Sequence, residues 1–315
     1  MDRLRKNRII IDTDLGCDCD DAGAVALANV LHNAGEGTVL AFLHSLAEKE
    51  TAACVDLINR YYGNSFPIGV ADNNNDDVRR YIRRGVYAMG RGCAVQLQDA
   101  AALLNELLGG EADGGVTLVA IGQQNNYARF LKDYPANIKK INKLVVMGGF
   151  FEQDEQYYLH GGNHRMEEFN IATDIASAKV VAEAGIPIVY SDFNLGKNIL
   201  TGDVFTQKYI ASPMAELYRI KGFINRSSWD LIATLYAFRE ESEIFSLSEP
   251  GTVHIDDGGR TTFEAGNGPH RLLKLNIADD DAARILTQII DGGTGKIERK
   301  EYEKIVSDRI GNLSY

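Results

Sequence analysis

Short apolar runs alternate with segments of helical periodicity along most of the chain. Six runs are almost continuously apolar, as expected of strands covered by helices on both faces of a parallel sheet. These predicted strands are residues 8–13, 39–45, 67–70, 116–121, 143–147 and 187–193. Helical patterns fill the intervals between them, in residues 20–33, 51–62, 95–108, 127–134 and 175–184.

This alternation predicts an α/β fold, a doubly wound and mostly parallel sheet flanked by helices, with a Rossmann-like core. No internal repeat or low-complexity linker divides the sequence, so we expect a single domain over residues 1–315. The Gly-rich and polar residues 256–269 are typical of a surface hairpin rather than a domain boundary.

Composition and charge exclude several classes of partner. The 315 residues are 45% hydrophobic, and 33 Lys and Arg against 44 Asp and Glu give a net charge of −11. This balance argues against nucleic-acid binding, which needs a basic face, and no apolar run is long enough to cross a membrane.

The cysteines and the amino terminus indicate a compartment. None of the four cysteines forms a paired zinc motif, and Cys17 and Cys19 are too close in sequence for an ordinary disulfide. The basic start lacks an apolar segment behind it. We expect a cytoplasmic protein in a reducing compartment, with a removed signal peptide as the alternative.

Carboxylates crowd the end of the first predicted strand, in the stretch IIIDTDLGCDCDD from Ile9 to Asp21. Asp12 and Asp14 end the strand, and Asp20 and Asp21 begin the next helix. Ligands of open α/β sheets bind beyond the carboxyl ends of the strands. Helix capping needs one aspartate, whereas clustered carboxylates need a counter-ion, and Ca²⁺ or Mg²⁺ prefers oxygen ligands.

Two other metal-dependent motifs fit this stretch less well. An EF-hand loop needs a D-x-[DN]-x-[DN]-G order and a late glutamate, which the segment from Asp12 to Gly16 breaks. The D-x-D strand of haloacid-dehalogenase-like phosphatases is a closer rival. Those enzymes have Thr or Val two positions after the D-x-D motif, whereas this sequence has Gly16 there.

Taken with four later segments, the aspartates resemble the nucleoside hydrolase family of inosine-uridine preferring type. The family signature is an amino-terminal D-x-D followed by D-D at a helix start, here with two extra residues between them, as in a less characterised bacterial branch. The later segments that resemble the family in the same order are LVAIGQQNN (118–126), KLVVMGG (143–149), GGNHRMEEFNIATD (161–174) and SSWDLIATLYA (227–237).

The resemblance implies a Ca²⁺ site and a riboside site. Asp14, Asp21, Asp230 and the main-chain carbonyl of Ile121 would hold the ion, together with ribose hydroxyls and a water. Asp14 would act as general base on the metal-bound water, which would attack the anomeric carbon as the N-glycosidic bond breaks.

The remaining site residues are also carried over from the family. Asp20, Glu168 and Asn170 would bind ribose hydroxyls, and Asn163 would lie near the 5′ end. Other interpretations stay open: Glu168 and Asn170 as ordinary loop residues beside a buried Phe169, and Asp20 or Asp230 as helix caps. We expect Met147 to be a core residue rather than a ligand.

Three positions depart from the family pattern. The usual leaving-group histidine before the late aspartate is Trp229, whose indole cannot donate a proton at neutral pH but can stack on a base such as a purine. The usual proline in the middle segment is Gln123, and the usual asparagine after the second strand is not evident in LHSLAEKE (43–50).

Several residues are candidates for a replacement acid, each weighed against a surface or structural role. Four lie in the loop of residues 150–165, and one ends the second strand: Tyr157, Tyr158, His160, His164 and His44. The other histidines are expected to be structural or solvated: His32, His254 and His270.

Three functions therefore remain open. The first is a Ca²⁺-dependent N-ribohydrolase acting on a nucleoside or related small riboside. The second is a riboside-binding protein of the same fold without turnover, and the third is a metal-dependent phosphatase built on the D-x-D strand. The sequence does not give the oligomeric state, although family members commonly form dimers or tetramers, so a homo-oligomer is an expectation.

Overall fold

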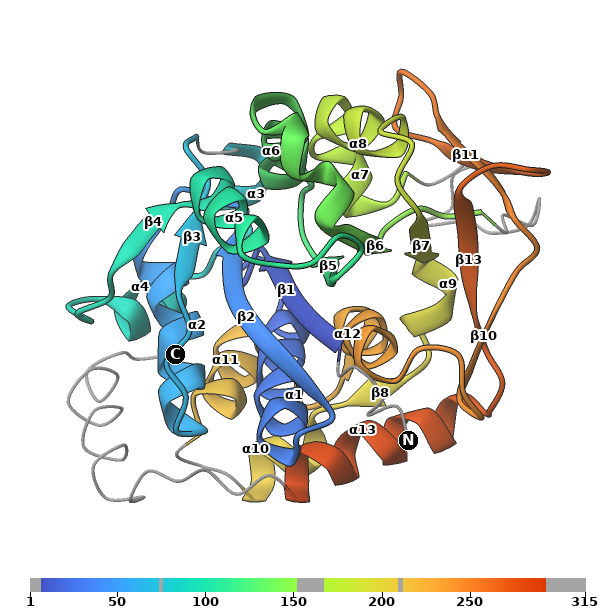
Figure 1. Cartoon of the computed structure of the whole chain (residues 1–315). Helices are drawn as coiled ribbons and strands as arrows, with labels where there is room; N and C mark the ends of the chain where they lie inside the picture. The colour runs from blue at the N-terminus through green and yellow to red at the C-terminus, as the bar shows by residue number, and fades with distance from the viewer. Residues whose placement is uncertain (1–6, 74–75, 152–166, 209–211, 293–315) are drawn as a thin grey trace.

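An eleven-stranded sheet forms the centre of the computed structural model, which describes residues 7–73, 76–151, 167–208 and 212–292 (Figure 1). Ten strands lie in the order β12-β11-β13-β7-β6-β5-β1-β2-β3-β4, and β10 pairs with β13 beside this path. The strands are β1 (Asn7–Thr13), β2 (Gly37–His44), β3 (Ile68–Val70), β4 (Leu97–Asp99), β5 (Val116–Ala120), β6 (Ile141–Met147), β7 (Ile188–Ser191), β10 (Phe245–Leu247), β11 (Gly251–Ile255), β12 (Thr261–Ala265) and β13 (His270–Leu275).

Helices cover both faces of this sheet, as the apolar runs predict (Figure 1). One face carries α1 (Asp20–Ala34), α2 (Lys49–Tyr61), α4 (Arg84–Gly90), α11 (Pro213–Lys221), α12 (Trp229–Arg239) and α13 (Asp279–Gly292). The other face carries α5 (Ala100–Gly109), α6 (Asn125–Asp133) and α8 (Ile175–Ala182). Shorter elements complete the described chain: α3 (Asp76–Arg79), the 3₁₀ helix η1 (Pro135–Lys140), α7 (Phe169–Ala172), α9 (Phe193–Gly196), α10 (Asp203–Lys208), and the strand pair β8 (Leu200–Thr201) and β9 (Arg226–Ser227).

The first strand shows why its sequence is continuously apolar. Ile9 and Ile11 point into the core below α1, α2 and α12, whereas Ile10 points into the core below α5 and α6. All three are fully buried. Burying each such side chain contributes about 1.5–3 kcal/mol to folding, so both faces of the strand must be apolar.

All six predicted strands and the α/β fold class are confirmed, and the main differences lie at the sheet edges. Residues 95–108 do not form one helix, because Leu97–Asp99 pairs in parallel with β3 as β4. The helix begins at Ala100, where the Asp99 side chain accepts the Ala102 N–H at 2.9 Å. Residues 256–269 contain the turn and second strand of a hairpin whose first strand, β11, begins earlier.

The strand order reverses next to β1, and this reversal positions the site. From β1 the chain proceeds through β2, β3 and β4 toward one edge, and from β5 through β6 and β7 toward the other. Asp12 of β1 is level with Leu43 of β2 and with Ala120 of β5, so the three strands end together. A crevice forms beyond the carboxyl ends of strands at such a switch point.

Within the described residues, the helices are all too short or too polar to cross a bilayer.

Candidate active site

A cleft of about 610 Å³ opens beyond the carboxyl ends of β1, β5 and β6. Its lining combines several carboxylates with four aromatic side chains, Tyr81, Phe169, Phe193 and Trp229. The side chains discussed below that line it are Asp14, Asp18, Asp20, Asp21, Asp77, Arg80, Tyr81, Ile121, Met147, Glu168, Phe169, Asn170, Phe193, Arg226, Trp229 and Asp230.

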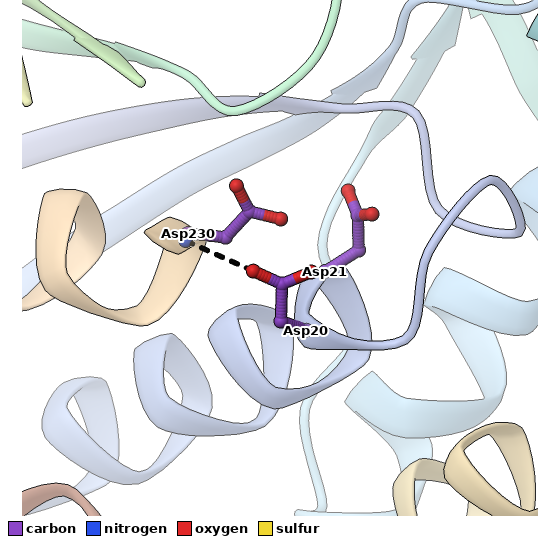
Figure 2. Close-up of side chains that lie close together, drawn as sticks. All are labelled: Asp20, Asp21 and Asp230. Atoms are coloured by element: carbon purple, nitrogen blue, oxygen red, sulfur yellow. Dashed lines mark hydrogen bonds between the residues drawn. The ribbon is translucent and has the colours of Figure 1, made fainter. Parts of the chain in front are cut away.

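Three aspartates converge on one point of this cleft. Asp20 and Asp21 project from the first turn of α1, and Asp230 projects toward them from the first turn of α12 (Figure 2). One carboxylate oxygen from each lies within 4.8 Å of the other two, and all three residues are buried. Asp230 lies 210 positions after Asp20 in sequence, so only the fold brings it to the Asp20–Asp21 pair.

Neither α1 nor α12 is capped by its own aspartates. The N-cap residue of α1 is Cys19 and that of α12 is Ser228, and neither of these two residues makes a side-chain capping bond. The Asp20 carboxylate accepts the main-chain N–H of Asp230, in the first turn of α12, at 3.2 Å (Figure 2). Asp20 and Asp230 therefore lie within the first turns of their helices and do not cap the helices that they belong to.

The three buried carboxylates of the cluster repel one another unless a cation compensates their charge. Burial raises the pKa of Asp20, Asp21 and Asp230 well above the ordinary aspartate value, and the neighbouring carboxylates raise it further. Ionising all three without compensation is therefore costly. A site made only of carboxylate oxygens suits a hard divalent ion such as Ca²⁺, so the donor set fits this metal.

Asp14 lies in the same cleft but outside the closest group of three. The Gln123 amide donates to Asp14 Oδ2 at 3.0 Å, and Ser45 Oγ donates to the Gln123 oxygen at 3.2 Å. Burial raises the pKa of Asp14 to about 6, although the hydrogen bond from Gln123 lowers it. A carboxyl with this pKa can accept a proton near neutral pH.

The loop between β1 and α1 brings these aspartates together. The Thr13 hydroxyl donates to the Asp21 carboxylate and accepts the Leu15 N–H at 3.1 Å. Gly16 has a φ of 114°, a conformation that L-residues rarely adopt, and a Cβ there would lie 3.0 Å from Thr51 Cγ2. This turn requires glycine at the position that distinguishes the sequence from a phosphatase D-x-D motif.

Ile121 and Met147 line the cleft floor at the ends of β5 and β6. Both side chains are buried in the core below α1 and α12. The expectation that Met147 is a core residue is confirmed, and its carbonyl accepts the Asn170 side-chain N–H at 3.2 Å. The main-chain carbonyl of Ile121 as a metal ligand stays a prediction.

Glu168 and Asn170 also line the cleft. Glu168 caps α7: its carboxylate accepts the N–H groups of Asn170 at 2.9 Å, Ile171 at 3.0 Å and Gly149 at 3.3 Å. Burial raises the pKa of Glu168 to about 7, although these three donors lower it. The two residues are therefore fixed parts of the cleft rather than ordinary loop residues, and Phe169 between them is only partly buried.

Trp229 lines the cleft beside Asp230, but its ring is already engaged. Its indole N–H donates to the Phe193 carbonyl at 2.8 Å, and its ring stacks on Phe193 with centroids 5.3 Å apart. The Arg226 guanidinium lies 4.8 Å from the indole centroid. Trp229 therefore has no free donor for a leaving group.

Sequence reasoning missed two contacts at the cleft: the Gln123 bond to Asp14 and the ion pair that joins Asp18 to Arg226. Asp18 sits in the aspartate-rich stretch, yet only the fold shows that it faces a residue 208 positions later. For Gln123 the signal was its position in place of a proline.

The candidates for a replacement acid fall into two groups. His44 is fully buried, and its ring lies between the main chain of Leu46 and the carbonyl of Leu15. Burial lowers its pKa to about 4, and it does not line the cleft. The other candidates lie outside the described residues, as does Asn163: Tyr157, Tyr158, His160 and His164.

The remaining histidines have structural or surface roles, as expected. Val39 N–H donates to His32 at 3.1 Å, and Val253 N–H donates to the buried His270 at 2.8 Å. His254 is exposed beside Glu264 on the edge hairpin.

Solved structures with the same architecture are nucleoside hydrolases and related proteins. A plant nucleoside hydrolase, PpNRh1, superposes with a TM-score of 0.70 and 15% identity, covering 90% of this chain and 98% of its own. The inosine-uridine preferring nucleoside hydrolase of Bacillus anthracis gives a TM-score of 0.70 and 18% identity, covering 92% of this chain and 100% of its own. At these identities the likeness establishes the fold.

Curated relatives match a shorter stretch more closely. The pyrimidine-specific ribonucleoside hydrolase RihA of Enterobacter sp. (strain 638) is 36% identical over 107 residues, 33% of this chain and 32% of that protein. RihB of Escherichia coli O17:K52:H18 is 33% identical over 109 residues, 34% of this chain and 33% of that protein. The match thus spans about a third of each relative.

The family itself is established over a much longer range. Residues 9–273 match the family described as inosine-uridine preferring nucleoside hydrolase, a range that includes both aspartate segments and the whole described cleft. The chain belongs to this nucleoside hydrolase family.

Proposed function

We propose that this protein is a Ca²⁺-dependent N-ribohydrolase that cleaves the N-glycosidic bond of a nucleoside or related riboside. The observation that carries the proposal is the convergence of Asp20, Asp21 and Asp230 at the switch point, in one cleft with Glu168 and Asn170. Such a cleft offers carboxylates suited to a cation and further polar groups suited to sugar hydroxyls. Membership of the nucleoside hydrolase family supports the same reaction.

The residues that would hold the ion are Asp14, Asp21, Asp230 and the carbonyl of Ile121, with Asp20 close enough to take part. Ca²⁺, when bound, supplies positive charge that offsets the buried carboxylates, orients sugar hydroxyls and lowers the pKa of the attacking water. The side chains of the four aspartates are buried carboxylates, and this is the donor type that Ca²⁺ prefers.

Riboside binding would involve several side chains of the cleft. Asp20, Glu168 and Asn170 would accept or donate hydrogen bonds to ribose hydroxyls, and Asn163 would lie near the 5′ end. Trp229 would border the base. Asp14 would take a proton from the water that attacks the anomeric carbon. The Gln123 side chain, which donates to the Asp14 carboxylate at 3.0 Å, would hold Asp14 in place. Carboxylates nearby favour the positive charge that develops on the sugar as the bond breaks.

Ribose release from a panel of purine and pyrimidine ribosides tests this proposal. We expect Asp14→Asn to lower turnover by roughly 100-fold or more while folding normally, because it removes the proton acceptor. The matched control is Asp56→Asn, a buried carboxylate paired with Arg60 outside the cleft. Ribose release that persists in Asp14→Asn would exclude this residue as the base.

Riboside binding without turnover is a second candidate, favoured by Trp229. The indole N–H is bound to Phe193, so it cannot protonate a leaving group. Saturable riboside binding with no ribose release would establish this alternative.

The phosphatase hypothesis has less support. Both arginines of the described cleft wall are paired with carboxylates, Arg80 with Asp77 and Arg226 with Asp18, so their positive charge is already offset in a cleft that holds several further carboxylates.

A further inference from the structure

Arg226 is held beside the cleft by a clamp of three side chains. Its Nε and Nη2 donate to Asp18 Oδ2 at 3.0 Å and 2.5 Å. Its guanidinium also lies 4.8 Å from the ring centroids of both Phe223 and Trp229. Because the two bonds to one carboxylate and the two ring contacts restrict the guanidinium, its orientation is fixed before any ligand binds.

One end of this guanidinium remains available. Nη1 has no hydrogen-bond partner in the part of the chain that the structure describes, whereas Nε and Nη2 are both used. Arg226 lines the cleft three positions before Trp229, and its side chain is 27% exposed. Nη1 therefore offers two N–H donors near Trp229, the residue that borders the predicted base position.

Arg226 joins two segments of the cleft. Asp18 lies in the loop between the two aspartate pairs, and Trp229 is the first residue of α12. Both contact Arg226, so the clamp links the aspartate-rich loop to the start of this helix.

We propose that Arg226 stabilises the departing base by donating a hydrogen bond from Nη1 to a carbonyl oxygen of that base. This inference rests on the proposed function and names its substrate class: ribosides whose base bears a carbonyl conjugated to the glycosidic nitrogen, as in uracil. An arginine stays protonated at neutral pH, so it stabilises negative charge without transferring a proton.

The reaction balances without a protein acid. The C1′–N bond breaks and its electron pair passes to the ring nitrogen and the conjugated carbonyl oxygen, which accepts the Arg226 N–H. The oxygen of water bonds to C1′ and its proton passes to Asp14. The released base then takes a proton from solvent, and Asp14 returns one, leaving ribose and the neutral base.

Comparing two substrates of Arg226→Met separates this role from a structural one. Uridine has a poor leaving group that needs stabilisation, whereas p-nitrophenyl β-D-ribofuranoside releases an anion that is stable in water. We expect kcat on uridine to fall roughly 100-fold, the effect of removing one donor to a developing anion. On the nitrophenyl riboside we expect a change within roughly three-fold, because that leaving group needs no such donor.

Arg239→Met is the matched control. Arg239 is the last residue of α12, the helix that Trp229 begins, and makes a two-bond pair with Glu36 at 2.8 Å and 3.0 Å. Its side chain is 28% exposed, close to the value for Arg226. It lies about 15 Å along the helix from Trp229, so we expect no change with either substrate.

Each outcome decides the matter. A loss confined to uridine supports the proposal. Equal losses on both substrates, or no loss on either, overturn it and leave the proposed function standing. A wild-type protein that releases ribose from other ribosides of the panel but not from uridine overturns only the role of Arg226, whereas no release from any of them in Ca²⁺ overturns the proposed function itself.

Discussion

At the scale of single residues, each buried carboxylate of the cleft is defined by its neighbours. Asp14 receives an amide donor from Gln123, Asp21 receives the Thr13 hydroxyl, and Glu168 receives three main-chain N–H groups. Asp230 has no such donor among its stabilising contacts, and every neighbour that shifts its pKa is another aspartate. Asp230 is therefore the carboxylate that depends most on a cation.

Asp230→Asn tests that dependence. Removing a buried, repelled charge should raise the melting temperature of the calcium-free protein, since the remaining carboxylates lose a like-charged neighbour. The same change should remove most of the stabilisation that Ca²⁺ gives the wild type. When free Ca²⁺ is at 100 times its Kd, that stabilisation is about 2.7 kcal/mol in the free energy of unfolding. Thermal unfolding with Ca²⁺ and with a chelator measures both effects.

The control for this comparison is Asp56→Asn, which should keep the full calcium response because Asp56 lies outside the cleft. A full calcium response in Asp230→Asn would rule out Asp230 as a ligand.

At the scale of elements, the short helix α9 supports the start of α12, the helix that carries Asp230. The end of α9 packs directly against the start of α12, and Gly196 accepts the Ser228 N–H at 3.2 Å. A Cβ on Gly196 would lie 2.5 Å from Trp229 Cα, closer than real Cβ contacts. The position of Asp230 thus depends on a glycine in a neighbouring helix.

Gly196→Ala should displace the start of α12. We expect a loss of about 1–3 kcal/mol in the free energy of unfolding, typical of overpacking, together with weaker Ca²⁺ binding. Urea unfolding and calcium titration measure the two effects. Gly109→Ala is the control: its nearest neighbour would be 3.8 Å away, so it should leave calcium affinity unchanged. Unchanged affinity in Gly196→Ala would show that α12 tolerates the displacement.

The strands and helices also differ in how well the sequence predicts them. The continuously apolar strands were predictable because both faces of a parallel sheet are buried, as Ile9, Ile10 and Ile11 demonstrate. Strand β4 was missed because Leu97–Asp99 adjoins a helical pattern and is recognised only by its pairing with β3. Asp20 and Asp21 were found from their spacing, whereas the contact of Asp18 with Arg226 depends on how distant segments pack.

At the scale of the whole molecule, the switch point gathers charge that the fold must tolerate. Glu168 illustrates the consequence, because burial raises its pKa from the ordinary 4.5 to about 7. The folded protein then binds more protons than the unfolded chain between these values. The contribution of Glu168 to the free energy of unfolding is fully present below about pH 4.5 and is lost as the pH rises through 7.

The predicted result is a decline in the free energy of unfolding between pH 5 and pH 8, on the order of 3 kcal/mol from Glu168. Urea unfolding of the calcium-saturated protein measures it, with the aspartates held by the ion throughout. Glu168→Gln should flatten this part of the profile, since the amide does not ionise. An unchanged slope in Glu168→Gln would assign the decline to other groups.

The most direct test of the whole account is the rate of ribose release from a riboside panel as free Ca²⁺ is varied, with Asp14→Asn measured beside the wild type. The account predicts no release in excess chelator, recovery as Ca²⁺ is restored, and no recovery in Asp14→Asn. Ribose release by the wild type in excess chelator would contradict the central claim that the aspartate cluster acts through a bound cation.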